Sequence, residues 1–499
     1  MKPFVAPLFD ALLRHTRTAE IGFHVPGHRG GEALNQPEWS DQAYLEANTY
    51  FQTVMRIDVT ELSSTDDLHH PEASIMEAQR LAARTFGSED TYFLVGGSTS
   101  GNIALLLTIC EPNDLIIVQR NVHKSVLNGL RLAGARAVFL SPQVEVQSGL
   151  ATIPSVQQVE EALVKYPEAK AVFLSNPNYY GMNVRLTPYV ELVHQYNLPI
   201  LIDEAHGAHY SMHGELPPSA VSEGADAVVQ SAHKTLPTLT MGAMLHVQGE
   251  RISRQQLSES LAMIQSSSPS FPIMASIDIS RAMIDALGAK LFQQSLDSAN
   301  IFRAWLDKQS TGICEMKAES SEWHDLCNDP LRVVLYDKRG KLTGYELQQQ
   351  LESRGCYVEM ADPRYVVLVL GIQASLADIQ KLQYTLEQIS VMTEERLSFI
   401  NDDQELSVKK FEQMILSEPV SFARGRFKYE ASKRIPLHES EHHVSAELVV
   451  PYPPGIAILY PGETITAAAI SRIKELASVG AKFQGSLDGQ MATISVYLQ

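Results

Sequence analysis

The chain has 499 residues, of which 44% are apolar and 20% charged, as is ordinary for a soluble globular protein of several domains. A net charge of −18 argues against nucleic acid and against an anionic membrane as partners. No apolar run approaches the ~20 residues of a membrane helix, no metal site is expected, and the 4 cysteines form no CxxC pair, so we expect them reduced in a cytoplasmic protein.

The N-terminal region is expected to combine helices with irregular loops. The first 15 residues predict an amphipathic helix rather than a signal peptide, because Asp10 and Arg14 interrupt the apolar run. Segment 23–31 (FHVPGHRGG) is rich in Gly, Pro and His and predicts a loop, either at the surface or beside a ligand or a partner subunit. Residues 71–87 predict a helix that ends at a glycine.

Residues 91–110 read as an apolar strand, a Gly/Ser/Thr turn and an apolar helix. Backbone N–H groups at the helix start, together with the hydroxyls of Ser98, Thr99 and Ser100, predict an anion pocket. The turn matches neither a Walker loop nor GxGxxG, and a simple helix cap is the alternative interpretation.

Strand-like and helical patterns then alternate up to residue 247. The expected strands are 115–119, 137–140, 171–175, 199–203, 227–231 and 242–247. Short apolar strands joined by helices predict a mainly parallel sheet that is covered on both faces, with ligands bound at the carboxyl ends of the strands. The polar residues at those ends are His123, Asn176, Asp203, His206, Ser231, His233 and Lys234.

Beyond the sheet, residues 250–310 look helical, and strands and helices between 330 and 390 predict a small α+β unit. The acidic stretch 401–406 is a candidate linker. The predicted organisation is an N-terminal segment of helix and interface loops (1–60), a large α/β domain (61–310), a small α+β domain (311–400) and a C-terminal α+β domain (401–499).

Lys234 carries the first chemical hypothesis. It follows a buried strand and precedes Pro237, so burial should favour its neutral, nucleophilic amine, which is the form that makes an imine with an aldehyde. A solvated loop lysine is the alternative. The other His-Lys pair places Lys124 at the start of a helix, where a surface lysine is usual.

The residues around Lys234 suit one cofactor. Asp203 could keep a pyridine nitrogen protonated, His123 could stack on a flat ring, and Ser98, Thr99 and Ser231 could bind a phosphate. An imine lysine, a pyridinium carboxylate, a phosphate cup and a stacking partner are what pyridoxal 5′-phosphate requires. The sequence therefore predicts this cofactor.

Five motifs then carry a family resemblance: SAHKTLPTLTMGAMLH, DEAHGAHY, NPNYYG, FHVPGHRGG and PYPPGIAILYPGE. They resemble the Orn/Lys/Arg decarboxylase family, in the right order, from about residue 5 to the C-terminus. The resemblance implies a large domain of the aspartate-aminotransferase-like fold (fold type I of pyridoxal-phosphate transferases). It also implies decarboxylation of lysine, arginine or ornithine to the amine and CO2, as in polyamine biosynthesis.

The resemblance assigns roles to the site residues. Lys234 would be the internal-aldimine lysine, Asp203 the partner of the pyridine nitrogen and His123 the stacking residue, and Lys234 or His233 would return a proton to Cα. The remaining expected cofactor contacts are Ser98, Thr99, Ser100, Ala205, His206, Ser231 and His233.

The substrate's second cation needs an acid, and the candidates are Asp66, Asp67 and Glu463; for each, a solvated surface acid is the alternative. The family also implies a homodimer with the active site at the subunit interface, or a tetramer, as in the shorter Gram-positive-type members. We expect no N-terminal wing domain, because the PGHRGG motif begins near residue 26. The sequence departs from the family at GGSTSGN, at Ala457 and at 437–447.

Two alternatives stay open. One is an aminotransferase or aldolase on the same fold, in which Arg364 would clamp the substrate α-carboxylate. The other is a catalytically silent regulator that binds pyridoxal phosphate or polyamines.

Overall fold

The computed structural model describes most of the chain. The described residues are 2–18, 21–36, 38–318, 325–393, 416–422, 431–452, 457–478, 481–484, 486 and 488–498. The predicted linker 401–406 lies outside them, as do parts of the predicted C-terminal domain.

The largest sheet has eight strands in the order β1-β8-β7-β6-β4-β2-β3-β14. The strands are β1 (Asp90–Leu94), β2 (Leu115–Gln119), β3 (Arg136–Leu140), β4 (Val172–Ser175), β6 (Ile200–Asp203), β7 (Ala227–Gln230), β8 (Ala243–Val247) and β14 (Val420–Ser421). Strands β7, β6, β4, β2 and β3 run parallel, whereas β8, β1 and β14 are antiparallel to their neighbours. The predicted mainly parallel sheet is confirmed.

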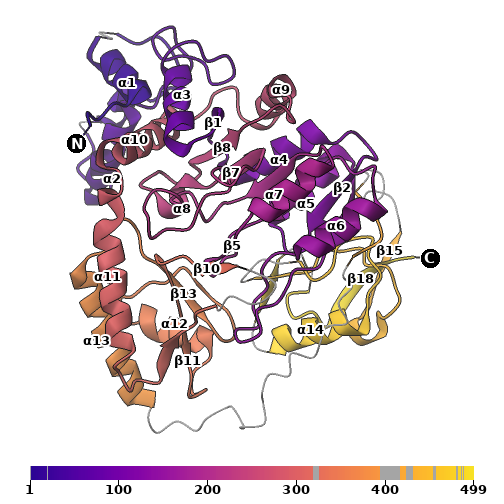
Figure 1. Ribbon diagram of the computed structural model, residues 1–499. Coiled ribbons are helices and arrows are strands. Elements are labelled where there is room, and N and C mark those ends of the chain that lie inside the picture. Colours follow the sequence, from indigo (N-terminus) through magenta and orange to yellow (C-terminus); the bar gives the residue numbers. More distant parts are fainter. Residues whose placement is uncertain are drawn as a thin grey trace.

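Helices cover both faces of this sheet (Figure 1). They are α3 (Ser74–Phe86), α4 (Gly97–Ile109), α5 (Lys124–Ala133), α6 (Val156–Lys165), α7 (Thr187–Gln195), α8 (Ala232–Thr235), α9 (Arg254–Ile264) and α10 (Phe271–Leu287). Because successive side chains of a strand point to opposite faces, Ile116 and Val118 pack with α4, α5 and α9, while Ile117 packs with α6 and α7. This double burial explains why the strands are continuously apolar.

A second sheet, of four strands in the order β12-β13-β11-β9, lies beside the first (Figure 1). Its strands are β9 (Ile313–Glu315), β11 (Arg332–Asp337), β12 (Met360–Ala361) and β13 (Val366–Val369), and its helices are α11 (Lys290–Leu306), α12 (Gly344–Glu352) and α13 (Leu376–Thr393). A two-stranded pairing of β5 (Met182–Val184) with β10 (Leu326–Asn328) connects it to the large sheet. The loop that follows β4 also contacts the segment before β11, because the N–H of Asp329 donates to the carbonyl of Gly181 at 2.8 Å.

The described C-terminal residues form two small antiparallel pairs and a helix. The elements are β15 (Ser432–Pro436), η3 (Leu437–Glu439), β16 (Val450–Tyr452), α14 (Ala467–Ser478), β17 (Lys482–Gln484) and β18 (Thr493–Tyr497). This part, yellow in Figure 1, packs beside the large sheet, and β14 extends that sheet at β3. Tyr460 and Phe422 contribute to the same core cluster as the sheet residue Phe139.

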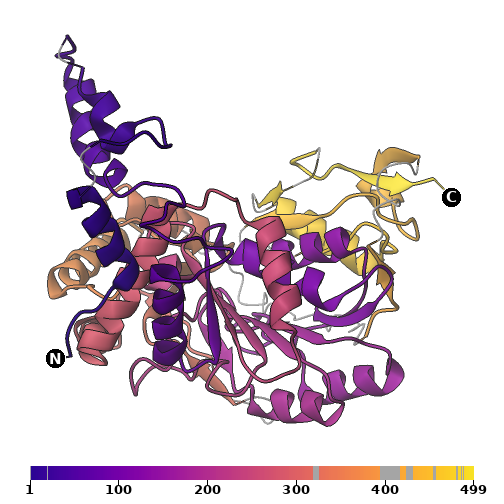
Figure 2. The ribbon, with the colours of Figure 1, turned by 90° about the horizontal axis from the view of Figure 1, so that it is seen from above.

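The N-terminal elements are α1 (Pro7–Thr18), η1 (Arg29–Leu34) and α2 (Gln42–Met55). Helix α1 is anchored on α10, because the carboxylate of Asp278 accepts hydrogen bonds from the N–H groups of Leu8 and Phe9. Helix α2 has no buried residue. Together with η1 and the residues around them (21–36 and 38–56), it stands out from the body as an arm (Figure 2). Among the described helices, none has both the length and the apolar character that a bilayer-spanning segment requires.

Candidate active site

Lys234 lies directly beyond the carboxyl end of β7, in the short helix α8. Its partly buried side chain brings Nζ to 3.0 Å from Nε2 of His206. Burial lowers the pKa of the Lys234 amine, and the charge of Asp203 partly opposes this shift. Lys124, the alternative imine lysine, is exposed at the start of α5. The structure therefore places the more nucleophilic amine at position 234.

Asp203 ends β6 and is 5% exposed. Its Oδ2 accepts a hydrogen bond from Nδ2 of Asn102 at 2.8 Å, and its Oδ1 accepts one from the N–H of Ala205 at 3.1 Å. Both carboxylate oxygens are therefore held in a fixed orientation by hydrogen bonds. Asn102 was not predicted from the sequence, although an asparagine inside the apolar run of α4 is a signal that a polar partner is buried nearby.

His123 is the N-cap of α5, and its Nδ1 lies 2.8 Å from Oγ of Ser125. Burial lowers the pKa of the His123 ring, Asp203 raises it, and Lys234 lowers it. The three predicted side chains Lys234, Asp203 and His123 thus come from three different strand ends and interact electrostatically at one place.

The rest of the predicted phosphate cup lies at the ends of β1 and β7. Ser231 is fully buried, and its Oγ has no hydrogen-bond partner in the described part of the chain. Ser98 and Thr99 occupy the first turn of α4, where Thr99 is exposed. The Oγ of Ser100 donates to the carbonyl of Gly97, so this hydroxyl holds the turn itself. A buried hydroxyl without a partner is suited to donate a hydrogen bond to a phosphate oxygen.

His206 and His233 flank Lys234 with fixed orientations. The Nδ1 of His233 lies 3.1 Å from the carbonyl oxygen of Gly242, which can only accept, so the neutral ring carries its proton on Nδ1. His206 contacts the ring of Tyr179 at 4.7 Å between centroids. Its Nδ1 lies 3.3 Å from Nη2 of Arg332, the first residue of β11 in the small sheet. Sequence reasoning missed Arg332, which appears there only as a lone charge before an apolar strand.

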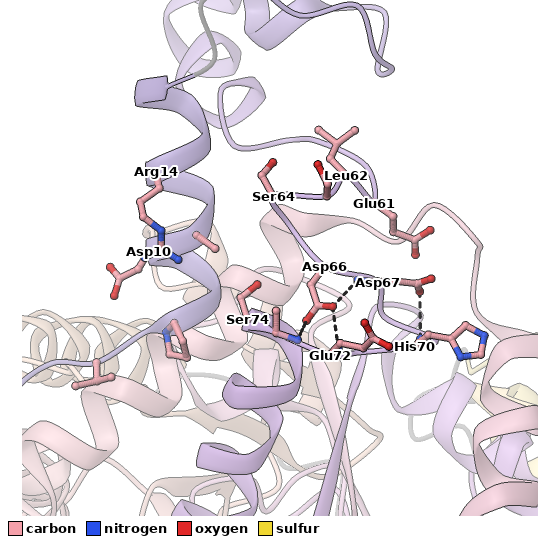
Figure 3. A pocket seen from close by; sticks show the side chains of 15 residues that line it. Asp10, Arg14, Glu61, Leu62, Ser64, Asp66, Asp67, His70, Glu72 and Ser74 are labelled. Atoms are coloured by element: carbon pink, nitrogen blue, oxygen red, sulfur yellow. Dashed lines mark hydrogen bonds between the residues drawn. The ribbon is translucent and has the colours of Figure 1, made fainter.

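Two of the predicted substrate acids accept hydrogen bonds from backbone N–H groups within the described chain. Asp66 accepts hydrogen bonds from the N–H groups of Glu72, Ala73 and Ile75 at the start of α3 (Figure 3). Burial alone would raise the pKa of the Asp66 carboxyl, but these N–H donors bring it below its usual value. Asp67 similarly accepts from the N–H of His69 at 2.7 Å.

These acids line a cavity of about 680 Å³ between α1 and the 61–74 segment (Figure 3). Its lining residues do not include Lys234, Asp203 or His123. Within this chain, Asp66 and Asp67 therefore line a cavity that the candidate imine lysine does not line.

Glu463 and Arg364 also have partners. Both carboxylate oxygens of Glu463 bind the Arg120 guanidinium, at 2.8 and 2.6 Å, which ties the C-terminal part to the loop before His123. The Arg364 guanidinium lies 5.2 Å from the ring centroids of Tyr336 and Tyr365. Among the small-sheet arginines, Arg332 is the one whose charge acts on Lys234 and whose guanidinium contacts His206.

Glu359 is a further acid that the sequence did not single out. Its side chain is exposed just before β12, and its charge raises the pKa values of both Lys234 and His233. A carboxylate next to the small sheet therefore interacts electrostatically with both Lys234 and His233.

Comparisons with known families give a clear match. The model of the "Orn/Lys/Arg decarboxylase, major domain" matches residues 6–378, and that of the "Orn/Lys/Arg decarboxylase, C-terminal domain" matches residues 405–488.

Individual proteins agree with the family models. The chain is 37% identical to the "Uncharacterized protein YaaO" of Bacillus subtilis (strain 168), over 99% of this chain and 98% of that protein. It is 31% identical to the arginine decarboxylase of the same organism, again over 99% and 98% of the two chains. The crystal structure of the Francisella novicida lysine decarboxylase LdcF superposes with a TM-score of 0.81 at 20% identity, over 99% of this chain and 81% of that one.

Proposed function

The chain belongs to the Orn/Lys/Arg decarboxylase family, and is an amino-acid decarboxylase; on this premise we propose that it uses pyridoxal 5′-phosphate to convert arginine to the corresponding amine and CO2. Arginine is favoured among the basic amino acids by the similarity to an arginine decarboxylase along 99% of the chain. The observation that carries the proposal is the amine of Lys234, which lies 3.0 Å from His206 and interacts electrostatically with Asp203.

The residues present fit the cofactor. When bound, pyridoxal phosphate takes into its protonated ring the electrons that remain on the substrate as CO2 departs. Nζ of Lys234 would hold the aldehyde carbon, and Asp203, oriented by the hydrogen bond from Asn102, would hold the proton of the ring nitrogen. His123 would lie against one face of the ring and Ala205 against the other.

The buried Oγ of Ser231 supports this fit, because the described residues supply no hydrogen-bond partner for it. We propose that Ser98, Thr99 and Ser231 donate to the phosphate, together with N–H groups of the first turn of α4. Ser100 would contribute by holding that turn through its bond to Gly97. His206 and His233 would border the imine.

Lys234 is the better candidate for returning a proton to Cα. The proton of the neutral His233 ring is on Nδ1 and is directed at the Gly242 carbonyl, which leaves Nε2 as an acceptor. Burial also lowers the pKa of His233, so its cationic form is disfavoured. Lys234 can carry a proton on Nζ whenever the substrate has taken its place.

We propose that Glu359 attracts the second cation of the substrate. Its exposed carboxylate lies in the field of Lys234 and His233, whereas Glu463 is already neutralised by Arg120. A charged hydrogen bond to the substrate would contribute about 1.5 to 3 kcal/mol.

The test is CO2 release from arginine, lysine and ornithine at equal concentrations, with the amine product identified by mass spectrometry. We expect arginine to give the largest kcat/KM and Glu359→Gln to raise its KM about tenfold, because the paired charge is lost. The matched variant Glu352→Gln, which removes an acid at the end of α12, should leave KM unchanged.

Other outcomes distinguish the alternatives. A keto acid product without CO2 would favour the aminotransferase. Visible absorbance of bound cofactor without turnover of any of the three amino acids would favour the silent regulator. Lys234→Ala should abolish both the absorbance and the turnover, and retained CO2 release would contradict the site assignment.

We also propose that the enzyme is a homodimer in which the arm reaches a second copy. The arm exposes large apolar side chains to solvent, with Phe23 96%, Tyr50 76%, Trp39 61% and Phe51 58% exposed. Such a surface is unusual for a monomer. All 4 cysteines are free thiols, which is consistent with the proposed cytoplasmic location.

A further inference from the structure

Building on the proposed role of Lys234, we propose that Arg332 is a positioning residue that acts through His206. By donating to Nδ1 of His206, Arg332 fixes the ring tautomer whose proton sits on Nε2, and this N–H donates to Nζ of Lys234 and holds that amine neutral. His206 is then the group that touches the reacting atom, and Arg332 sets its orientation and protonation from the neighbouring sheet.

The hydrogen bond between Arg332 and His206 has only one possible direction. Nη2 of Arg332 lies 3.3 Å from Nδ1 of His206, and the two residues are 4% and 7% exposed. A guanidinium has donors only and keeps its charge inside proteins, so Nδ1 must be the acceptor and carry no proton. A neutral imidazole with an unprotonated Nδ1 carries its proton on Nε2.

The second contact then follows. Nε2 of His206 lies 3.0 Å from Nζ of Lys234. A protonated Nε2 can only donate here, and an ammonium group has no lone pair with which to accept. The hydrogen bond can therefore form only with the neutral amine, which is the nucleophile that an aldehyde requires. Burial lowers the pKa values of both His206 and Lys234, in agreement with a neutral pair.

Arg332 is itself held in place by its neighbours. Burial alone would raise the pKa of the Asp329 carboxyl, but His209, whose Nε2 lies 3.0 Å from Oδ2 of Asp329, and the charge of Arg332 together bring it below its usual value. On the other side, the 176–181 loop packs so closely that a Cβ at Gly181 would lie 2.7 Å from Cβ of Arg332. The guanidinium therefore keeps its orientation toward His206 as long as the small sheet stays packed on this loop. The packing of the small sheet is thereby coupled to the protonation state of Lys234.

The test must separate this hydrogen bond from simple charge effects. The titratable groups that face Lys234 are Asp203 on β6, Arg332 on β11, Glu359 before β12, and the rings of His123, His206 and His233. The positive charge of Arg332 alone also lowers the pKa of Lys234. Variants of His206 leave that charge in place and change only the hydrogen-bond relay.

The experiment uses the full chain freed of cofactor. Lysines are labelled competitively with acetic anhydride over a range of pH, and mass spectrometry gives the labelling midpoint of Lys234, with exposed Lys124 as the internal reference. In the wild-type chain we expect the Lys234 midpoint to lie below that of Lys124. His206→Leu should raise it by about one pH unit, so that labelling below the midpoint slows about tenfold.

Two conservative variants should preserve the relay. In His206→Gln the amide oxygen can accept from Arg332 while the amide NH2 donates to Lys234, so the midpoint should stay near that of the wild type. Arg332→Lys retains a charged donor for Nδ1 and should also preserve it, whereas Arg332→Met, which has no side-chain donor, should raise it. Arg339→Gln, which changes an arginine paired with Asp337 at the opposite end of β11, is the control and should have no effect.

A Lys234 midpoint that is the same in wild type and in His206→Leu would overturn the proposal and leave burial and the charge of Arg332 as the causes of the lowered midpoint. Equal midpoints for His206→Leu and His206→Gln would also overturn it. Circular dichroism establishes that each variant is folded. Because the readout needs neither cofactor nor turnover, a failure of the relay is distinguishable from a failure of the proposed decarboxylation.

Discussion

Asp203 shows how a single carboxylate can govern the rate. We expect Asp203→Ala to retain part of its cofactor through Lys234 but to lose turnover roughly a hundredfold or more, because the ring nitrogen loses its charge partner. Cofactor content is measured by absorbance and turnover by CO2 release. Near-normal turnover would contradict the role given to Asp203.

Asn102 provides a graded comparison for the same carboxylate. Asn102→Ala leaves Asp203 in place and removes the 2.8 Å donor to its Oδ2, together with the 3.0 Å hydrogen bond that the same amide group donates to Oγ of Ser125. One charge-assisted hydrogen bond of about 1.5 kcal/mol corresponds to a loss of about tenfold, so this variant should fall between wild type and Asp203→Ala.

The sequence predicts the residues that follow strands, and it misses those that reach the site from elsewhere. Lys234, Asp203 and His123 were found because each ends an apolar run and parallel strands end at one edge. Arg332 reaches His206 across 126 positions of sequence, and Asn102 reaches Asp203 across 101, so no local pattern reports either contact. The acids were equally ambiguous, since a carboxylate that caps a helix and one that binds a substrate look alike in a sequence.

Helix α3 depends on one such acid, and this gives a test of the ambiguity. We expect Asp66→Ala to lower the free energy of unfolding by about 2 kcal/mol, because three N–H groups of the helix start lose their acceptor. Chemical denaturation followed by circular dichroism measures this loss.

The matched variant is Glu72→Ala, which removes an exposed acid from the same cavity. It should leave stability nearly unchanged. If Asp66 instead served the substrate, Asp66→Ala would raise KM while the unfolding transition stayed in place.

Some helices and strands could likewise be predicted from the sequence, and others could not. Strands β2, β4, β6 and β7 match the predicted segments within a residue at each end, because a strand buried on both faces is a continuous apolar run with polar boundaries. The direction of β8, which is antiparallel to β7, could not be predicted. An apolar run is the same whether a strand pairs parallel or antiparallel with its neighbour. The pairs β5–β10 and β12–β13 involve strands of two to four residues, too short to carry a pattern of their own.

For the whole molecule, the arm is the feature that a single chain does not explain. Helix α2 buries none of its residues, although its ends are well formed and Asp41 caps its start. Helix α2 contacts η1, where the Gln52 side-chain amide donates to Asn35, but a helix of 14 residues without buried side chains is marginal in water, so we expect further packing to stabilise it. A second copy of the chain is the partner that the proposed homodimer supplies.

The double variant Tyr50→Ser/Phe51→Ser tests this arrangement. Aromatic residues at the centre of an interface contribute about 2 kcal/mol or more each, so we expect the dimer dissociation constant to rise by a factor of a hundred or more. Sedimentation equilibrium measures the constant, and Val391→Ser on α13, which changes a 67% exposed apolar residue elsewhere, is the control. The family resemblance implies an active site at the subunit interface, so activity of the double variant should fall in parallel with the fraction of dimer and recover at high protein concentration. A wild-type chain that sediments as a monomer while fully active would contradict both the dimer and the shared site, whereas loss of activity without dissociation would assign the arm a direct contact with the site instead.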